Sequence, residues 1–221
     1  MARTAADDGV LVIGLGRFGT ALAETLMDLG HEVLGVDSDA GNVQRNADLL
    51  THVVQADATD EEVMRQLGAG EFGRAVVGIG TDLEASILTT SVLAGLEVPD
   101  IWAKAITVPH GRILERVGAH HVVFPEHDMG RRVAHLVSGR MIEFVQLDEG
   151  FALVELKPPR QIVGRSLGDA QVRSRHGITV VCIKPAGGSF TYATPDTVPG
   201  PDDVLVVAGE TDRVAGFAEL G

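Results

Sequence analysis

The residues with the clearest chemical potential are three glycines near the N-terminus, in the run Gly14-Leu15-Gly16-Arg17-Phe18-Gly19. This run matches the G-x-G-x-x-G pattern that follows a first β-strand and opens a helix in dinucleotide-binding domains. In that pattern the first glycine makes a tight turn, the second leaves backbone amides open to phosphate, and the third allows close helix–strand packing. The positive end of the helix macrodipole faces the same point. The spacing therefore predicts a site for nucleotide phosphates.

A carboxylate stands where such a site needs one for the sugar. Asp37 ends the second apolar run of the chain, at about the 20-residue separation from the glycines that dinucleotide-binding domains show. A carboxylate in this position accepts hydrogen bonds from ribose hydroxyls and repels a 2′-phosphate. Asp37 therefore favours ATP, ADP or NAD(H) over NADP.

Small and polar residues follow the next two apolar runs. Asp57-Ala58-Thr59 comes after the third run and Gly78-Ile79-Gly80 after the fourth. The first group could approach the adenine with backbone and hydroxyl groups, and the second leaves open backbone beside the nucleotide. Both groups also suit ordinary turns, but ligands of open α/β sheets bind at the carboxyl ends of strands. We expect both groups to contact the ligand.

Arg17 is an unusual residue for a glycine loop, where an apolar or small residue is common in dinucleotide enzymes. A guanidinium here could reach terminal phosphate oxygens and distinguish ATP from ADP by charge. The alternative is a solvated arginine on the helix surface.

The elements that must position these residues alternate along the first two-thirds of the chain. Apolar runs begin at residues 10, 33, 52, 75, 101 and 121, and segments with helical spacing lie between them. Uniformly apolar strands separated by helices predict a doubly wound parallel sheet of the Rossmann type. Near residue 140 short strands and turn-rich pieces take over, with helical stretches near 166–175 and 212–220. The pattern predicts a disordered N-terminus (1–8), a nucleotide-binding domain (9–140) and a smaller α+β domain (141–221).

Composition narrows the partners and the compartment. The 221 residues are 45% hydrophobic and carry a formal net charge of −13. Such a chain repels nucleic-acid phosphates and anionic lipids. No apolar run reaches the length of a membrane span and no signal peptide is visible. Cys182 is the single cysteine, so an intrachain disulfide is excluded and we expect a soluble, cytoplasmic protein.

Several longer stretches resemble the RCK family, the regulators of potassium conductance, and are most similar to the cytosolic subunits of bacterial Ktr and Trk potassium-uptake systems. The resemblance covers nearly the whole chain, including both lobes. Its most specific stretches are residues 14–19, 57–60, 78–90, 101–105, 114–119 and 125–130.

The resemblance implies dimers that assemble into an octameric ring beneath an integral-membrane, potassium-translocating subunit. ATP and ADP, or NAD(H) in some relatives, would bind at the glycine loop and control potassium flux without being turned over. Arg17 matches the family arginine that senses the terminal phosphate. Glu126 matches a carboxylate that holds a divalent cation, magnesium or calcium, although an acid at a helix N-terminus needs no such role.

The resemblance has two further implications, for the C-terminal lobe and for the helix that precedes it. Some members bind cyclic di-AMP in this lobe, and the candidates here are equally compatible with core packing: Ile162, Val163, Arg173, Ile178 and Pro195. The helix near 126–138 has an apolar face that either packs on a partner subunit or packs within the chain: Met129, Val133, Leu136 and Val137.

Other functions fit the sequence less well. An NAD-dependent oxidoreductase shares the glycine fingerprint, but it needs an acid–base group near the nicotinamide, and no His/Asp or Tyr/Lys pairing is recognisable. A nucleotide-sensing transcription factor would need a basic recognition element. The P-loop pattern and metal-ligand spacings are absent from the sequence.

Overall fold

The structure, a computed structural model, describes residues 9–137 and 141–220. It divides into two compact units, residues 1–127 and 128–221. The segment 1–8, expected to be disordered, lies outside the described residues. No helix in the described part of the chain combines the length and apolar character that a membrane span needs.

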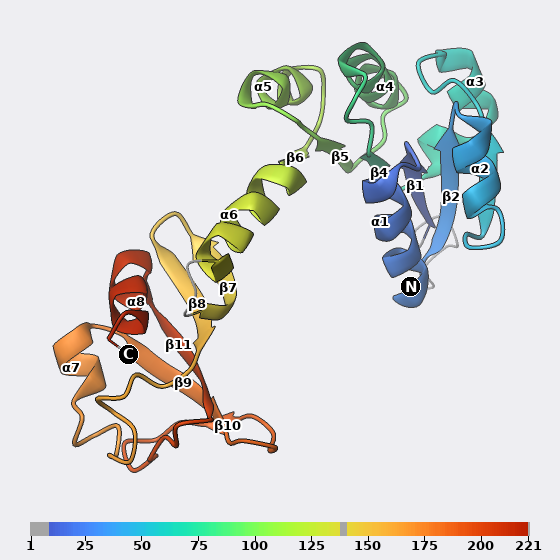
Figure 1. Cartoon of the computed structure of the whole chain (residues 1–221). Coiled ribbons are helices and arrows are strands. Elements are labelled where there is room, and N and C mark those ends of the chain that lie inside the picture. Colours follow the sequence, from blue (N-terminus) through green and yellow to red (C-terminus); the bar gives the residue numbers. More distant parts are fainter. Residues whose placement is uncertain (1–8, 138–140, 221) are drawn as a thin grey trace, which may run out of the picture. The chain divides into compact units, whose positions relative to one another are not determined.

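The N-terminal unit is built around a six-stranded sheet whose strand order is β3-β2-β1-β4-β5-β6 (Figure 1). All five strand pairs are parallel. The strands are β1 (Gly9–Ile13), β2 (Glu32–Asp37), β3 (His52–Gln55), β4 (Arg74–Val77), β5 (Ile101–Lys104) and β6 (His121–Val123). The helices are α1 (Arg17–Asp28), α2 (Ala40–Asn46), α3 (Glu61–Gln66), the 3-10 turn η2 (Ala69–Glu71), α4 (Leu83–Gly95) and α5 (Val108–Arg116). The predicted Rossmann-type, doubly wound sheet is confirmed.

Burial on both faces explains why these strands read as continuous apolar runs. Every residue of the central strand β1 is buried. One side of the sheet contributes Leu11 and Ile13 to the larger core, and the other contributes Val10 and Val12 to a second cluster. The strand order reverses between β1 and β4, because β2 and β3 lie on one side of β1 and the later strands on the other. The carboxyl ends of β1 and β4 therefore border the crevice in which such sheets bind ligands.

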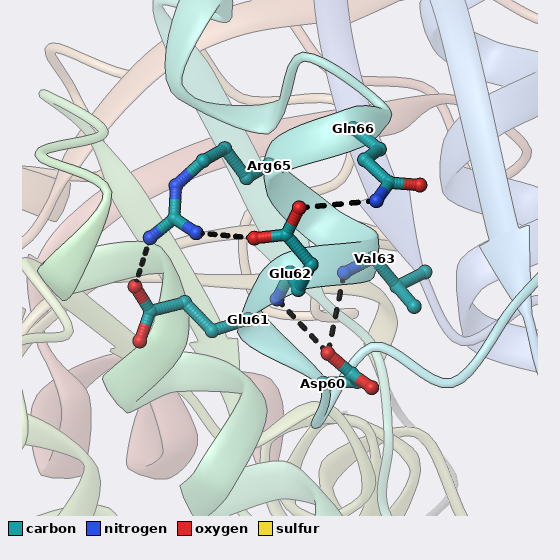
Figure 2. Close-up of polar contacts among 6 residues, drawn as sticks. All are labelled: Asp60, Glu61, Glu62, Val63, Arg65 and Gln66. Carbon is teal, nitrogen blue, oxygen red and sulfur yellow. Dashed lines mark hydrogen bonds and ion pairs between the residues drawn. The ribbon is translucent and has the colours of Figure 1, made fainter.

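Aspartate caps fix where the loops at this edge end and the next helices begin. The Asp60 Oδ1 atom accepts hydrogen bonds from the backbone amides of Glu62 (2.9 Å) and Val63 (3.2 Å), so it starts α3 directly after the third-strand loop. Figure 2 shows this cap together with Arg65, which pairs with both Glu61 and Glu62. Asp39 and Asp82 cap α2 and α4 in the same manner. Each cap holds a loop of the crevice in one position.

The C-terminal unit contains a five-stranded antiparallel sheet of order β10-β9-β11-β8-β7. Its strands are β7 (Met141–Asp148), β8 (Phe151–Leu156), β9 (Thr179–Lys184), β10 (Thr191–Tyr192) and β11 (Val204–Glu210), and its later helices are α7 (Val172–His176) and α8 (Thr211–Ala218). The helix predicted over 166–175 is shorter than expected. Gln171 adopts a left-handed conformation with φ of 50°, which ends the preceding turns and lets α7 start only at Val172.

Helix α6 (Pro125–Val137) joins the two units. The predicted boundary near residue 140 assigns this helix to the N-terminal domain, whereas its contacts group all but its first three residues with the C-terminal unit. Its Arg132 Nε atom donates to Glu143 Oε1 of β7 at 2.7 Å, and His135 stacks on Phe144 with ring centroids 3.9 Å apart. These side-chain contacts between α6 and β7 cannot be read from the spacing of apolar residues.

The apolar face expected on α6 is divided. Leu136 packs against the core of the C-terminal unit. Met129, Val133 and Val137 remain exposed, with Val137 at 78% of its full accessible surface. An exposed apolar stripe of this kind is typical of an interaction surface.

The Arg132–Glu143 pair makes an acid-dependent contribution to stability. The Arg132 guanidinium, followed by the Phe144 backbone amide, lowers the pKa of Glu143 below its ordinary value of 4.5 by bonding the charged form. A lowered pKa in the folded state stabilises the fold above the unfolded-state pKa, and this contribution is lost as pH falls through the folded-state value. We expect Glu143→Gln to lower the thermal midpoint at neutral pH, and this deficit should shrink as the pH falls through the lowered folded-state pKa of Glu143. The control is Glu149→Gln, which removes an exposed carboxylate from the β7–β8 turn. If the thermal midpoint of Glu143→Gln stayed equally far below that of the wild type at low pH, the ion pair would not be the cause.

Candidate functional site

A cavity of about 300 Å³ lies at the carboxyl ends of β1, β2, β3 and β4. It brings together most of the residues singled out from the sequence, namely Gly14, Gly16, Asp37, Asp57, Ala58, Thr59, Gly78, Ile79 and Gly80. Arg17, Phe18, Gly19 and Glu126 do not line it. Four separate loops thus converge on one hollow at the position where the strand order reverses.

The glycine loop has the geometry of a phosphate cradle. Gly14 has φ of +88°, and its amide donates to the Val36 carbonyl at 2.8 Å, so it makes the tight turn off β1. A Cβ atom at Gly19 would lie 1.8 Å from the Gly14 carbonyl oxygen, which only glycine avoids. A Cβ atom at Gly16 would meet nothing within 4 Å. The lack of a side chain at Gly16 is therefore not a packing requirement and leaves the backbone open.

The N-terminus of α1 differs from those of the neighbouring helices. Its N-cap is Gly16, which supplies no side-chain hydrogen bond, and its first turn contains no acidic residue. By contrast α2, α3 and α4 are each capped by an aspartate side chain. The amides of the first turn of α1 carry the positive end of the helix dipole without a carboxylate from their own turn. This helix end suits an external anion.

Asp37 joins β2 to the glycine loop. The residue is 9% exposed, and its Oδ2 atom accepts from the Leu15 amide at 2.6 Å and from Asn42 Nδ2 at 3.0 Å. Oδ1 accepts from the Asp39 amide at 2.8 Å. A carboxylate has about four acceptor sites, and three of them are used by these hydrogen bonds. The sequence did not predict that Asp37 would also hold the glycine loop through the Leu15 amide.

The third-strand loop is held by hydrogen bonds within it where it faces the cavity. Asp57 Oδ1 accepts from both the amide (2.9 Å) and the hydroxyl (2.7 Å) of Thr59. These two bonds, led by the hydroxyl, lower the pKa of Asp57 and keep it charged. Ala58 between them is nearly buried. The loop presents backbone and a small apolar side chain to a ligand.

Further lining residues were missed from the sequence: Ile13, Ser38, Asp39, Asn42, Ala56, Thr81, Asp82, Ala85 and Thr89. A signal existed for Asp39 and Asp82, since each is an aspartate directly before a helix. Thr89 gave no signal. Its hydroxyl is buried in α4 without a hydrogen-bond partner among the described residues, and it lies in the wall of the cavity.

Glu126 lies at the start of α6 and binds a lysine. Its Oε1 atom accepts from Lys104 Nζ at 2.5 Å. This bond is the main cause that lowers the pKa of Glu126, and the charge of Arg17 contributes in the same direction. Arg17 itself is exposed at the first position of α1. Glu126 is therefore paired with Lys104, and the positive charge of Arg17 acts on it through space.

The described residues do not by themselves form a cation site at Glu126. No group of three or more His, Cys, Asp or Glu side chains with suitable geometry occurs in the described ranges. The Oε1 atom of Glu126 is already bound to an ammonium. A divalent cation here would need ligands beyond these side chains, such as phosphate oxygens.

A second hollow, of about 570 Å³, lies in the C-terminal unit between α7 and β9. Three residues expected near cyclic di-AMP line it: Arg173, Ile178 and Pro195. Ile162 instead packs in the core at 3% exposure, and Val163 does not line the groove.

Known proteins are similar to this chain over most of its length. The Ktr system potassium uptake proteins A and C of Bacillus subtilis are 36% and 37% identical over 95% and 93% of this chain, and over 95% and 94% of their own lengths. A solved structure of the GsuK channel bound to NAD covers 97% of this chain with a TM-score of 0.66 and 19% identity. The chain spans 39% of that channel's length.

Family models match both units. The TrkA-N domain model matches residues 10–125, which contain the glycine loop and the whole cavity. The TrkA-C domain model matches residues 151–220, which contain the second groove. The chain therefore belongs to the TrkA-N/TrkA-C family, the RCK proteins that the sequence resembles.

Proposed function

We propose that this chain is a nucleotide-sensing regulatory subunit that controls potassium flux through a membrane-embedded translocating subunit. The observation that carries the proposal is the single cavity in which the uncapped end of α1 and the anchored carboxylate of Asp37 meet. The names of the B. subtilis relatives supply the process, potassium uptake. ATP, ADP and NAD(H) all carry the phosphate and ribose groups that this cavity suits.

The composition of the cavity favours sensing over chemistry. Its titratable lining residues are all aspartates, at positions 37, 39, 57 and 82. All four already accept hydrogen bonds from backbone amides. Hydride transfer to or from a substrate needs a positioned acid–base group beside the nicotinamide. An NAD-dependent oxidoreductase remains the alternative, and detectable nicotinamide turnover would favour it.

The proposed mechanism is a population shift within a homo-oligomer, a dimer that assembles into an octameric ring. ATP and ADP would stabilise different conformations, and the control can be no larger than their difference in affinity for the two states. The exposed residues Met129, Val133 and Val137 of α6 offer the apolar surface that such a partner copy needs. A divalent cation at Glu126 would then be shared with nucleotide phosphates.

Arg17→Ala should erase the difference between ATP and ADP. An exposed guanidinium at the first position of α1 can pair with the terminal phosphate, and its loss removes a charge-assisted contact that ADP does not make. We expect ATP affinity to fall about tenfold, with ADP affinity nearly unchanged, in isothermal titrations. Arg116→Ala, an exposed arginine at the end of α5, is the control. If Arg17→Ala lowered the affinities for ATP and ADP equally, Arg17 would attract nucleotides in general and would not recognise the terminal phosphate of ATP.

A direct test of the regulatory role uses potassium flux. The chain is added to proteoliposomes that contain its membrane partner, and flux is compared with ATP and with ADP. The proposal requires that flux differ between ATP and ADP and that this difference disappear when the chain is omitted. Flux that depends neither on the nucleotide nor on the chain would refute the proposal.

The groove in the C-terminal unit supports cyclic di-AMP as a second ligand. It combines one guanidinium, Arg173, with the apolar side chains of Ile178 and Pro195, a combination that suits phosphate and a purine ring. Titration of cyclic di-AMP into protein saturated with ADP tests this second site, because binding there should not displace ADP.

A further inference from the structure

Lys104 places a buried ammonium at the end of β5. The residue is 8% exposed, and its Nζ atom bonds Glu126 Oε1 at 2.5 Å. The two partners differ sharply in exposure: the side chain of Lys104 is 10% exposed and that of Glu126 is 65% exposed. The lysine is therefore fixed in the fold, while its carboxylate partner is free to exchange with solvent.

The Lys104 ammonium lies next to the cavity wall at Gly80. A Cβ atom placed on Gly80, a lining residue, would be 3.1 Å from Lys104 Nζ and 3.2 Å from its Cε. On another side, Nζ lies 5.5 Å from the centroid of the Phe18 ring. Phe18 belongs to the first turn of α1, whose amides form the cradle. The ammonium thus lies between the cradle helix and the wall of the cavity.

The hydrogen-bonding capacity of this ammonium is not exhausted. An ammonium has three donors, and the one hydrogen bond that Nζ makes among the described residues is to Glu126. A buried cation is costly unless anions compensate it. A phosphate that entered from the cavity would supply such acceptors, but its charge would repel Glu126.

We propose that Lys104 is a second cation of the nucleotide site and that phosphate and Glu126 compete for it. This inference rests on the nucleotide site proposed above. In the structure described here Glu126 holds the ammonium; when the terminal phosphates of ADP or ATP enter, Lys104 donates to them and the first turn of α6 loses its anchor. Phosphate binding is thereby coupled to the helix that leads into the C-terminal unit.

The competition predicts that substitutions of Lys104 and of Glu126 change the affinity for ADP in opposite directions. In isothermal titration of the full chain with ADP in EDTA, Lys104→Met should weaken binding at least about tenfold because a charged contact is lost. Glu126→Gln should tighten binding about threefold or more, because it removes the competing anion. Adenosine, which lacks phosphate, should bind both variants as it binds the wild type. Glu115→Gln, an exposed carboxylate on α5, should change nothing.

A purely structural ion pair would give a different pattern. It would leave ADP affinity unchanged in both variants, or weaken it in both, and either result overturns the exchange. If Lys104→Met does not fold, Glu126→Gln decides alone: tighter binding supports the exchange, and unchanged or weaker binding overturns it. Wild-type protein that binds neither ADP nor ATP would overturn the proposed function itself, whereas wild-type binding with an unaffected Lys104→Met variant overturns only the exchange.

Discussion

Replacing Gly16 with valine is expected to abolish nucleotide binding and to leave the fold nearly unchanged. The backbone of Gly16 has φ of −71° and ψ of −171°, a region that a β-branched residue adopts readily. A Cβ atom there meets no other atom within 4 Å. The added methyl groups would instead occupy the space in front of the α1 amides, where phosphate must approach. We expect ADP affinity to fall by about 100-fold or more, measured by isothermal titration.

Two other glycine substitutions make this result interpretable. Gly95→Val, at the last residue of α4, also has open space around its Cβ position and should bind ADP normally. Gly19→Ala should instead destabilise the protein, because its Cβ would lie 1.8 Å from the Gly14 carbonyl oxygen. If Gly16→Val bound ADP as well as Gly95→Val does, the cradle assignment would be wrong.

Asp37→Ala should reduce both stability and nucleotide affinity. The substitution removes the acceptor for the Leu15 amide and for the Asn42 side chain, and it leaves a buried amide unpaired. Such a loss typically costs about 1–3 kcal/mol of unfolding free energy. The glycine loop loses one of its ties to β2, the bond from the Leu15 amide, so we expect about tenfold weaker binding even of adenosine.

Chemical unfolding and adenosine titration of the same variant measure the two effects together. Asp48→Ala, which removes an exposed carboxylate after α2, is the matched control and should match the wild type in both. If Asp37→Ala bound adenosine with unchanged affinity, the Asp37 carboxylate would not bind the ribose, and its role would be structural only.

Much of the N-terminal unit follows from local sequence. The apolar runs are strands because both faces of the sheet are covered, and the glycines at 14 and 19 are required by a positive φ and by a close approach. The carboxyl-edge rule then brings Asp37, Asp57 and Gly78 together, since parallel strands end at the same side. These predictions need only strand direction and strand order.

Features that depend on tertiary contacts were not predictable. The bond between Lys104 and Glu126 joins the ends of β5 and α6 and depends on strands that pair only in the folded sheet. The shortened α7 depends on the left-handed backbone at Gln171, a residue type with no strong preference for that conformation. The contacts of Arg132 and His135 that attach α6 to the C-terminal unit are of the same kind.

The most direct test of the central claim is an isothermal titration of the full chain with ADP, ATP and NADH, with NADP as the matched comparison. We predict saturable binding of the three adenine nucleotides at one mutually exclusive site per chain, and much weaker binding of NADP, because Asp37 repels a 2′-phosphate. The absence of binding by every adenine nucleotide, or binding that the Gly16→Val substitution does not affect, would contradict the claim.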